Sequence, residues 1–395
     1  MNETPRISGR RLLHSPGPTP LPDEVLHALM GQPMDMGDPR VSQHIDACER
    51  GLREVLRTDA DVFLYGCNGH GAWEAAIVNF LPPDATVLVP GTGHFSEGWA
   101  QQAEALGRKV LRTPWVEGLP ISAEAVAEVL REDREHQIAA VFVVHTDTSS
   151  GITSDLTALR AALDAADHPA LFVVDVVASL GAEEFDMDAL RIDVALGASQ
   201  KGLMSPPGLA FLATNERAFA VAQGNPAQRF FWDIVQRKSD LSYRKFCGTP
   251  PQNLIAAMAA ALALLQREGL PQVLARHRLH AGLVHAAVEG WREGGALDFF
   301  ALEAASRSNS VTTITVPAGT DIEALRTLAR EQYQVAFAGA LGPLQGRGFR
   351  IGHLGDQNPG QLLGALAAVE AALERQGIPL GAGGTRRALL RLAAC

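Results

Sequence analysis

The sequence predicts an α/β protein: a large domain with a mostly parallel sheet covered by helices, followed by a smaller α+β domain. Short apolar runs alternate with longer helical segments such as residues 155–166, which are long enough for crossover helices. The apolarity of these runs is continuous rather than alternating, which is typical of strands buried on both faces. The runs read VFLYG, TVLVPG, KVLRTP, AAVFVVH, ALFVVD, VALGAS and LAFLAT.

Three regions follow from this pattern, because 395 residues are enough for about two domains. Residues 1–19, which contain SPGPTPLP, predict an extended N-terminal arm. Residues 20–265 form the predicted large domain, and residues 266–395 form the small one. Helical patterns are expected at 23–30, 43–57, 253–291 with a break near Gly269, 321–333 and 359–376, and strand-like patterns at VTTITVP and FRIGHLG.

Composition and charge exclude several classes of protein. The net charge is −10 with no Lys/Arg-rich block, which argues against a nucleic-acid partner. No apolar run reaches the ~18–20 residues of a membrane span, and the N-terminus lacks the pattern of a secretory signal. The four scattered cysteines have neither metal-site spacing nor the density of a disulfide scaffold. We therefore expect a cytoplasmic protein without a metal, membrane or nucleic-acid partner.

Polar residues directly follow several of the apolar runs. In an open parallel sheet, ligands bind beyond the carboxyl ends of the strands. In CNGHGAWEA, a glycine-rich turn leads into a helix, so Asn68, Gly69 and His70 predict a phosphate cradle of backbone N–H groups. Asp175 ends ALFVVD, and Lys201 follows VALGAS. Each feature alone is common for structural reasons, but together at one edge they favour a ligand site.

One chemistry uses all of these residue types. A pyridinium ring needs an anion beside its nitrogen, and its aldehyde needs a lysine amine with a lowered pKa. Its phosphate needs N–H and hydroxyl donors, and its face needs an aromatic ring such as Phe95 in GTGHFSEGW. Asp175 and Lys201 lie 201 − 175 = 26 residues apart at two successive strand ends. The pattern thus predicts pyridoxal 5′-phosphate carried on Lys201.

The strings HTDTSSGI, VVDVVASLGAEEFDMDALRIDVALGASQKGLMSPPGLAFL and FRIGHLG resemble class V aminotransferases. The resemblance is to the alanine–glyoxylate and serine–pyruvate branch, which includes serine– and aspartate–glyoxylate enzymes. It extends from SPGPTPLP to IGHLGD, and the block 175–208 is its most specific part. It implies the fold of type I pyridoxal-phosphate enzymes.

The resemblance also implies a role for each matching residue. Lys201 would be the Schiff-base lysine and proton carrier, and Asp175 would pair with the pyridine nitrogen. The other predicted cofactor contacts are with the ring faces (Phe95 and Val177), the 3′-oxygen (Thr148) and the phosphate (Asn68, Gly69, His70 and Gln200).

Two residues are predicted to bind the substrate. Arg350, in GFRIGHLG, matches the arginine that grips the substrate carboxylate, a bidentate task that suits guanidinium. An isolated structural salt bridge is the alternative role for Arg350. Gly17, in the N-terminal arm, is the second predicted substrate contact.

The segment KFCGTPPQN implies a homodimer. Thr249 matches a residue that reaches the cofactor phosphate of the neighbouring subunit, which would make the active site composite. Phe246 departs from the tyrosine that relatives often have shortly before this threonine, and a phenyl ring donates no hydrogen bond. Some relatives carry a His-Arg pair where this chain reads DMGDPR, so the preferred donor is expected to differ from theirs.

The implied reaction is a ping-pong transamination from a small L-amino acid (alanine, serine or aspartate) to glyoxylate or another small 2-oxo acid. A desulfurase or lyase on the same fold is one alternative, but desulfurases need a nucleophilic cysteine on a late mobile loop and residues 306–355 contain none. A non-catalytic relative is another, but it would not need Lys201, Asp175 and Arg350 together. The donor stays open; an acidic one would need a second cation, for which Arg40, Arg229 and Arg244 are candidates.

Overall fold

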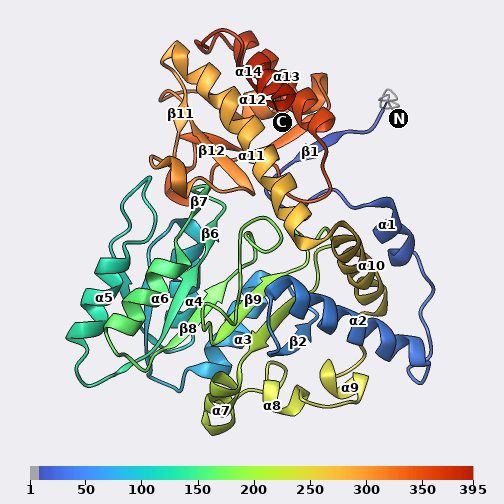
Figure 1. Cartoon of the computed structure of the whole chain (residues 1–395), viewed down its shortest axis with the longest axis vertical. Helices are drawn as coiled ribbons and strands as arrows, with labels where there is room; N and C mark the ends of the chain where they lie inside the picture. The colour runs from blue at the N-terminus through green and yellow to red at the C-terminus, as the bar shows by residue number, and fades with distance from the viewer. Residues whose placement is uncertain (1–8, 395) are drawn as a thin grey trace.

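A computed structural model describes residues 9–394 and contains a seven-stranded sheet with the order β2-β10-β9-β8-β5-β3-β4 (Figure 1). Every apolar run of the predicted large domain forms one of its strands. All neighbouring strands are parallel except β10, which is antiparallel to β2 and β9. This confirms the predicted α/β class. The strands are β2 (Asp61–Tyr65), β3 (Thr86–Pro90), β4 (Lys109–Thr113), β5 (Ile138–Val144), β8 (Leu171–Asp175), β9 (Val194–Ala198) and β10 (Ala210–Thr214).

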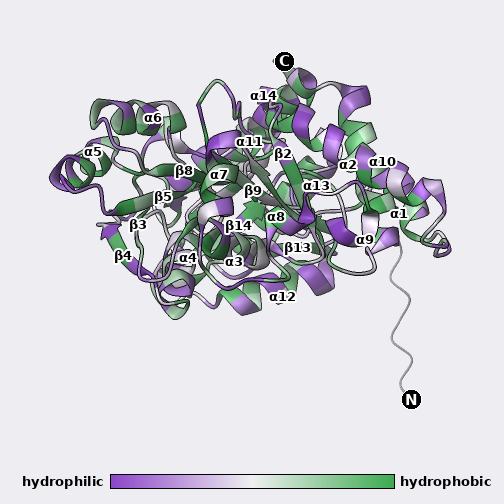
Figure 2. Ribbon diagram, turned by 90° about the horizontal axis from the view of Figure 1, so that it is seen from below, coloured by the Kyte–Doolittle hydropathy of each residue, from purple (hydrophilic) through white to green (hydrophobic). Residues whose placement is uncertain are grey.

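Helices cover both faces of this sheet, which explains why its strands are continuously apolar. In β5, Val141 and Val143 pack into one hydrophobic cluster, whereas Phe142 and Val144 pack into the other. Figure 2 shows the hydrophobic residues gathered in the central strands and hydrophilic ones on the outer turns of the helices. One face is covered by α2 (Pro39–Leu56), α5 (Ala123–Glu132), α6 (Leu156–Ala165) and α10 (Gln252–Glu268), and the other by α3 (Gly69–Phe80), α4 (His94–Ala105) and α7 (Glu216–Gly224).

A second sheet has the strand order β1-β13-β14-β12-β11 and lies above the first in Figure 1. Its hydrophobic core lies between the sheet and the helices of the C-terminal region. Its elements are β11 (Asp298–Phe299), β12 (Val311–Thr315), β13 (Val335–Gly339), β14 (Gly348–Gly352), α11 (Leu270–Trp291), α12 (Ile322–Gln332), α13 (Pro359–Arg375) and α14 (Gly384–Ala393).

The N-terminal arm contributes a strand to this second sheet. In β1 (Leu12–His14), Leu12 pairs with Val335 in the parallel register of β1 and β13. The described part of the arm is thus partly a strand rather than only an extended tail. Residues 1–8 lie outside the described range, and the three domain boundaries stay predictions.

The helix boundaries follow local capping chemistry. The helix expected at 43–57 begins at Pro39 instead, because Asp38 accepts a hydrogen bond from the backbone N–H of Arg40 and proline suits the first helical position. The break between α10 and α11 falls at Gly269, which has φ +84°. Shorter elements are α1 (Asp23–Leu29), α8 (Ile234–Arg237), α9 (Ser242–Lys245), β6 (Thr146–Asp147) and β7 (Ile152–Thr153).

Among residues 9–394, no single helix is long and apolar enough to cross a bilayer. Only α10 and α11 together reach the necessary length and composition, and the two are bent by 89° at their junction.

Candidate active site

A cavity of about 260 Å³ lies at the carboxyl edge of the large sheet. The parallel strands all end at this edge, so residues that follow different strands meet there. Within the described part of the chain, Thr249 and Arg350 are the predicted site residues that do not line the cavity. Those that line it are Gly17, Asn68, Gly69, His70, Phe95, Thr148, Asp175, Val177, Gln200 and Lys201.

The N-terminus of α3 forms one wall of the cavity. Asn68 caps this helix, since its Oδ1 accepts a hydrogen bond of 3.2 Å from the backbone N–H of Gly71. The first N–H groups of a helix have no partner within the helix and carry partial positive charge, so they bind anions. Gln200 also lines the cavity, and its side-chain Nε2 is a hydrogen-bond donor. The wall therefore fits a phosphate group.

The carboxylate of Asp175 is held at both oxygens. Oδ1 accepts from the backbone N–H of Val177 at 2.7 Å, and Oδ2 accepts from Nε1 of Trp73 at 2.6 Å. Burial raises the pKa of Asp175 to about 6, while the two N–H donors act in the opposite direction. At neutral pH the group is still ionised, so the cavity contains a buried anion that can pair with a positively charged group of a ligand.

Lys201 is the one amine among the described residues that line the cavity. Burial, followed by the positive charge of Arg350, lowers the pKa of Lys201 to about 8, although Asp175 and Asp147 favour its charged form. Its Nζ donates a hydrogen bond to the carbonyl oxygen of Pro16 in the N-terminal arm. A substantial share of the amine is therefore neutral near physiological pH.

The N-terminal arm passes directly over the lysine. Thr19 donates from its hydroxyl to the carbonyl of Lys201 at 3.1 Å and from its N–H to the carbonyl of Gln200 at 3.2 Å. Gly17 has φ +108°, and a Cβ at this position would lie 2.4 Å from Cδ of Lys201. Glycine suits this position because the backbone φ is positive, and a side chain here would have to displace the flexible end of Lys201.

Phe95 sits in the first turn of α4, and a carboxylate from another element holds that turn. Asp147 accepts hydrogen bonds from the N–H of Phe95 at 2.9 Å and of Ser96 at 3.4 Å. It also accepts from the N–H of Ser149 at 2.9 Å. Asp147 is fully buried and thus fixes the position of Phe95 at the cavity.

Trp73 and Asp147 contact the site but were not predicted from the sequence. Both lie inside strings that carried the prediction, CNGHGAWEA and HTDTSSGI. A tryptophan in a buried helix is usually a packing residue, and the partner that distinguishes Trp73 is 102 residues away. Their local sequence carries no signal of these contacts.

Arg350 is buried in β14, 6% exposed, behind the cavity wall. Its Nε donates to the carbonyl of Gly339 at 2.8 Å and its Nη1 to the carbonyl of Thr148 at 3.0 Å. These bonds go to carbonyls rather than to a carboxylate, and neither uses Nη2. Burial lowers the pKa of Arg350 to about 10, so the guanidinium stays charged at neutral pH.

No residue of the KFCGTPPQN segment lines this cavity. Thr249 is exposed to solvent, and Phe246 is 5% exposed and packs into the core of the large domain. The ring of Phe246 therefore contributes to packing within its own chain.

The cysteine beside the phosphate turn is a poor nucleophile. Burial raises the pKa of the Cys67 thiol to about 12, so little of it is thiolate at neutral pH. Cys395 lies outside the described residues.

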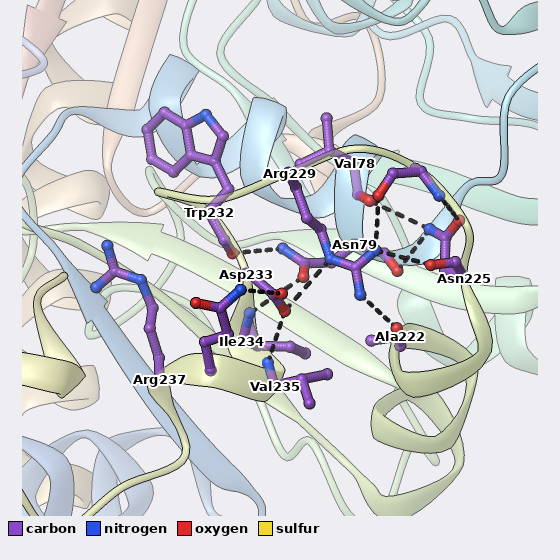
Figure 3. A network of polar contacts seen from close by, with 12 residues as sticks. Val78, Asn79, Ala222, Asn225, Arg229, Trp232, Asp233, Ile234, Val235 and Arg237 are labelled. Carbon is purple, nitrogen blue, oxygen red and sulfur yellow. Dashed lines mark hydrogen bonds and ion pairs between the residues drawn. The ribbon is translucent and has the colours of Figure 1, made fainter.

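The three candidate second cations also lie elsewhere in the described chain. Arg40 pairs with Asp38 at 2.5 Å, and Arg244 is exposed. Arg229 is committed to structure: its Nη1 donates to the carbonyl of Asn225 at 3.0 Å, and its Nε pairs with Asp233 at 3.4 Å (Figure 3). In this arrangement none of them supplies a second cation to the cavity of its own chain.

The site and the two sheets define a type I pyridoxal-phosphate fold. The structure is similar to that of ureidoglycine–glyoxylate aminotransferase from Bacillus subtilis, with a TM-score of 0.89 at 27% identity, covering 99% of this chain and 100% of that one. The family model for class V aminotransferases matches residues 11–340, and the chain belongs to this family.

Two relatives are similar over nearly their whole length. One is L-aspartate–glyoxylate aminotransferase from Paracoccus denitrificans, 37% identical over 371 residues, which are 93% of this chain and 92% of the relative. The other is serine–glyoxylate aminotransferase from Methylorubrum extorquens, 35% identical over 386 residues, which are 96% and 94% of the two chains.

Proposed function

We propose that this protein transfers an amino group from a small L-amino acid to glyoxylate or another small 2-oxo acid, with pyridoxal phosphate on Lys201. One observation carries the proposal: an ionised buried carboxylate, an amine with a lowered pKa and the N-terminus of a helix line the same cavity. The names of the Paracoccus and Methylorubrum relatives supply the acceptor and two of the donor candidates.

The cofactor, when bound, supplies an aldehyde for the amino group and a ring that withdraws electrons. The residues that would hold it are the start of α3 and Gln200 at the phosphate, Asp175 at the ring nitrogen, Phe95 and Val177 at the faces, and Thr148 near the 3′-oxygen.

Lys201 does the proton transfer in this proposal. Its Nζ would take the proton from the α-carbon of the substrate and deliver it to the cofactor carbon that had carried the aldehyde, which a neutral amine does most readily when its pKa lies near the working pH. A pKa of about 8 meets that requirement. Asp175, which stays charged, would stabilise positive charge on the ring nitrogen in a site shielded from water, where such electrostatic contributions are large.

Arg350 binds the substrate carboxylate in this proposal. Its guanidinium is held by two backbone carbonyls, and Nη2 is not used by either bond. Binding of the substrate carboxylate would therefore cost little conformational entropy at Arg350, since the side chain is already fixed. Reaching the carboxylate requires the substrate to lie at the Thr148 side of the cavity.

We further propose a homodimer with a composite site, which the exposure of Thr249 supports. Large exposed apolar side chains in neighbouring segments, at 60% or more, provide a surface for a second copy: Phe230, Leu241 and Tyr243. Sedimentation should give a dimer mass. Mixing Lys201→Ala chains with Thr249→Ala chains should restore activity in mixed dimers if Thr249 serves the neighbouring site, because one of the two sites then has both residues intact.

The cytoplasmic location stays a prediction.

The transaminase proposal is tested with a panel of alanine, serine and aspartate against glyoxylate and pyruvate, measuring kcat/KM. At least one pair should give turnover, and Lys201→Ala should abolish it without lowering Tm. The matched control is Lys109→Ala, since Lys109 is exposed on β4. Release of ammonia from serine without any acceptor would favour the lyase alternative, and formation of alanine from added cysteine would favour the desulfurase alternative. An absence of all reactions would favour a non-catalytic protein.

A further inference from the structure

Trp73 contacts three parts of the candidate active site at once. It lies in the second turn of α3, the helix that begins at the phosphate turn, and it is 2% exposed. Its ring lies 4.4 Å from that of His70 and 6.3 Å from that of Phe95, between centroids. Its Nε1 donates to Oδ2 of Asp175 at 2.6 Å.

The indole is fixed by stacking on its other side. Trp73 stacks on Trp99 with a centroid distance of 5.8 Å and an interplanar angle of 12°, and Trp99 stacks on Phe142 at 4.3 Å and 19°. Phe142 belongs to β5 in the centre of the sheet. The hydrogen-bond donor of Trp73 is thus anchored to the sheet core and has little freedom to turn away from Asp175.

The chemistry of the indole N–H makes the contact selective. An indole nitrogen donates and does not accept, so the bond requires an oxygen without a proton on the side that faces it. Bonds from a donor to a charged oxygen are stronger than bonds between neutral groups. Burial favours the protonated form of Asp175, and the N–H groups of Trp73 and Val177 oppose this effect.

We propose that Trp73 is a positioning residue that keeps the Asp175 carboxylate anionic and in a fixed orientation at the cavity. This inference rests on the proposed function, because an anion at this place matters for a cofactor with a ring nitrogen. Trp73 acts through Asp175, and the catalytic role in this pair belongs to Asp175.

Trp99 is the matched control in the same stack. It is fully buried, and its Nε1 has no hydrogen-bond partner in the described residues. Trp73→Phe and Trp99→Phe therefore make the same chemical change at adjacent positions. Only Trp73→Phe removes a donor from Asp175.

The experiment measures equilibrium binding of pyridoxal phosphate and of its 1-deaza analogue, in which carbon replaces the ring nitrogen, to the cofactor-free full-length chain. Absorbance titration follows both ligands in wild type and in the two variants. For Trp73→Phe we expect about tenfold weaker binding of pyridoxal phosphate, about 1.4 kcal/mol, and less than a twofold change for the analogue. Trp99→Phe should change both affinities by the same factor.

An equal effect of Trp73→Phe on the two ligands, or no effect on either, would overturn the positioning role, since a purely structural residue does not distinguish a nitrogen from a carbon. If Trp73→Phe does not fold, β-(3-benzothienyl)alanine at position 73 keeps the shape of the side chain, removes the donor and is measured in the same way. Failure of the wild-type chain to bind pyridoxal phosphate would instead overturn the proposed function, and this inference with it.

Discussion

Gly17→Ala is expected to damage the active site through the lysine. The added Cβ would lie 2.4 Å from Cδ, 2.6 Å from Cε and 2.9 Å from Nζ of Lys201. Optimal carbon contacts are about 3.5–4.0 Å, so the end of the lysine must move by about 1 Å. A displacement of about 1 Å at a reacting group costs roughly 10²-fold in rate. We therefore expect kcat/KM to fall by about two orders of magnitude.

The control for this change is Gly107→Ala. Gly107 has φ +79° and no atom within 4 Å of an added Cβ, so it carries the backbone strain without the clash. Both variants should lose about 1–2 kcal/mol of stability because alanine disfavours positive φ, measured by urea unfolding. Only Gly17→Ala should lose activity with the best donor and glyoxylate. A Gly17→Ala enzyme that keeps more than a tenth of wild-type kcat/KM would refute the steric argument.

Three further predictions follow from the charged and buried groups. The rate at which the cofactor-free protein captures pyridoxal phosphate, measured by stopped-flow absorbance, should increase as pH rises through about 8, the pKa of Lys201. Arg350→Gln should move this inflection to higher pH because it removes a charge that repels the protonated amine. An unmoved inflection would contradict the effect of Arg350 on the pKa of Lys201. Burial lowers the pKa of His280 from 6.5 to about 4. Between pH 6.5 and about 4 the unfolded state therefore binds more protons than the folded state, so the free energy of unfolding falls as the pH falls, by about 1.4 kcal/mol per pH unit for each such group. Urea unfolding at pH 7 and pH 5 should show a smaller loss in His280→Leu than in wild type, and an equal loss would count against this histidine. Asp147→Asn should destabilise the protein by about 1–3 kcal/mol, because the NH2 end of the amide, which accepts no hydrogen bond, would face the N–H of either Phe95 or Ser149; unchanged urea unfolding would argue against these contacts.

The sequence was sufficient to predict the large sheet because its signal is local. Each strand is a short apolar run, and burial on both faces makes the run continuous. Asp175 and Lys201 could be predicted to lie close together because residues at the carboxyl ends of parallel strands meet at one edge of the sheet, and both line the same cavity.

The features that escaped prediction depend on distant partners. β1 has only three residues in a proline-rich arm, and its partner strand begins at Val335. Such a pairing leaves no periodicity in either segment. Arg350 matches a family position, but its placement behind Thr148 depends on how the two sheets pack. Trp73 has an ordinary helical context, and only the fold brings its N–H to Asp175.

A half-reaction measured without an acceptor tests the proposed transamination most directly. Cofactor-loaded protein is mixed with the best amino donor alone, and the released 2-oxo acid is counted per active site. We predict one equivalent per site, and later addition of glyoxylate should then yield one equivalent of glycine and restore the starting absorbance. Continuous release of oxo acid without glyoxylate, or no release with any donor, would contradict the proposed transamination.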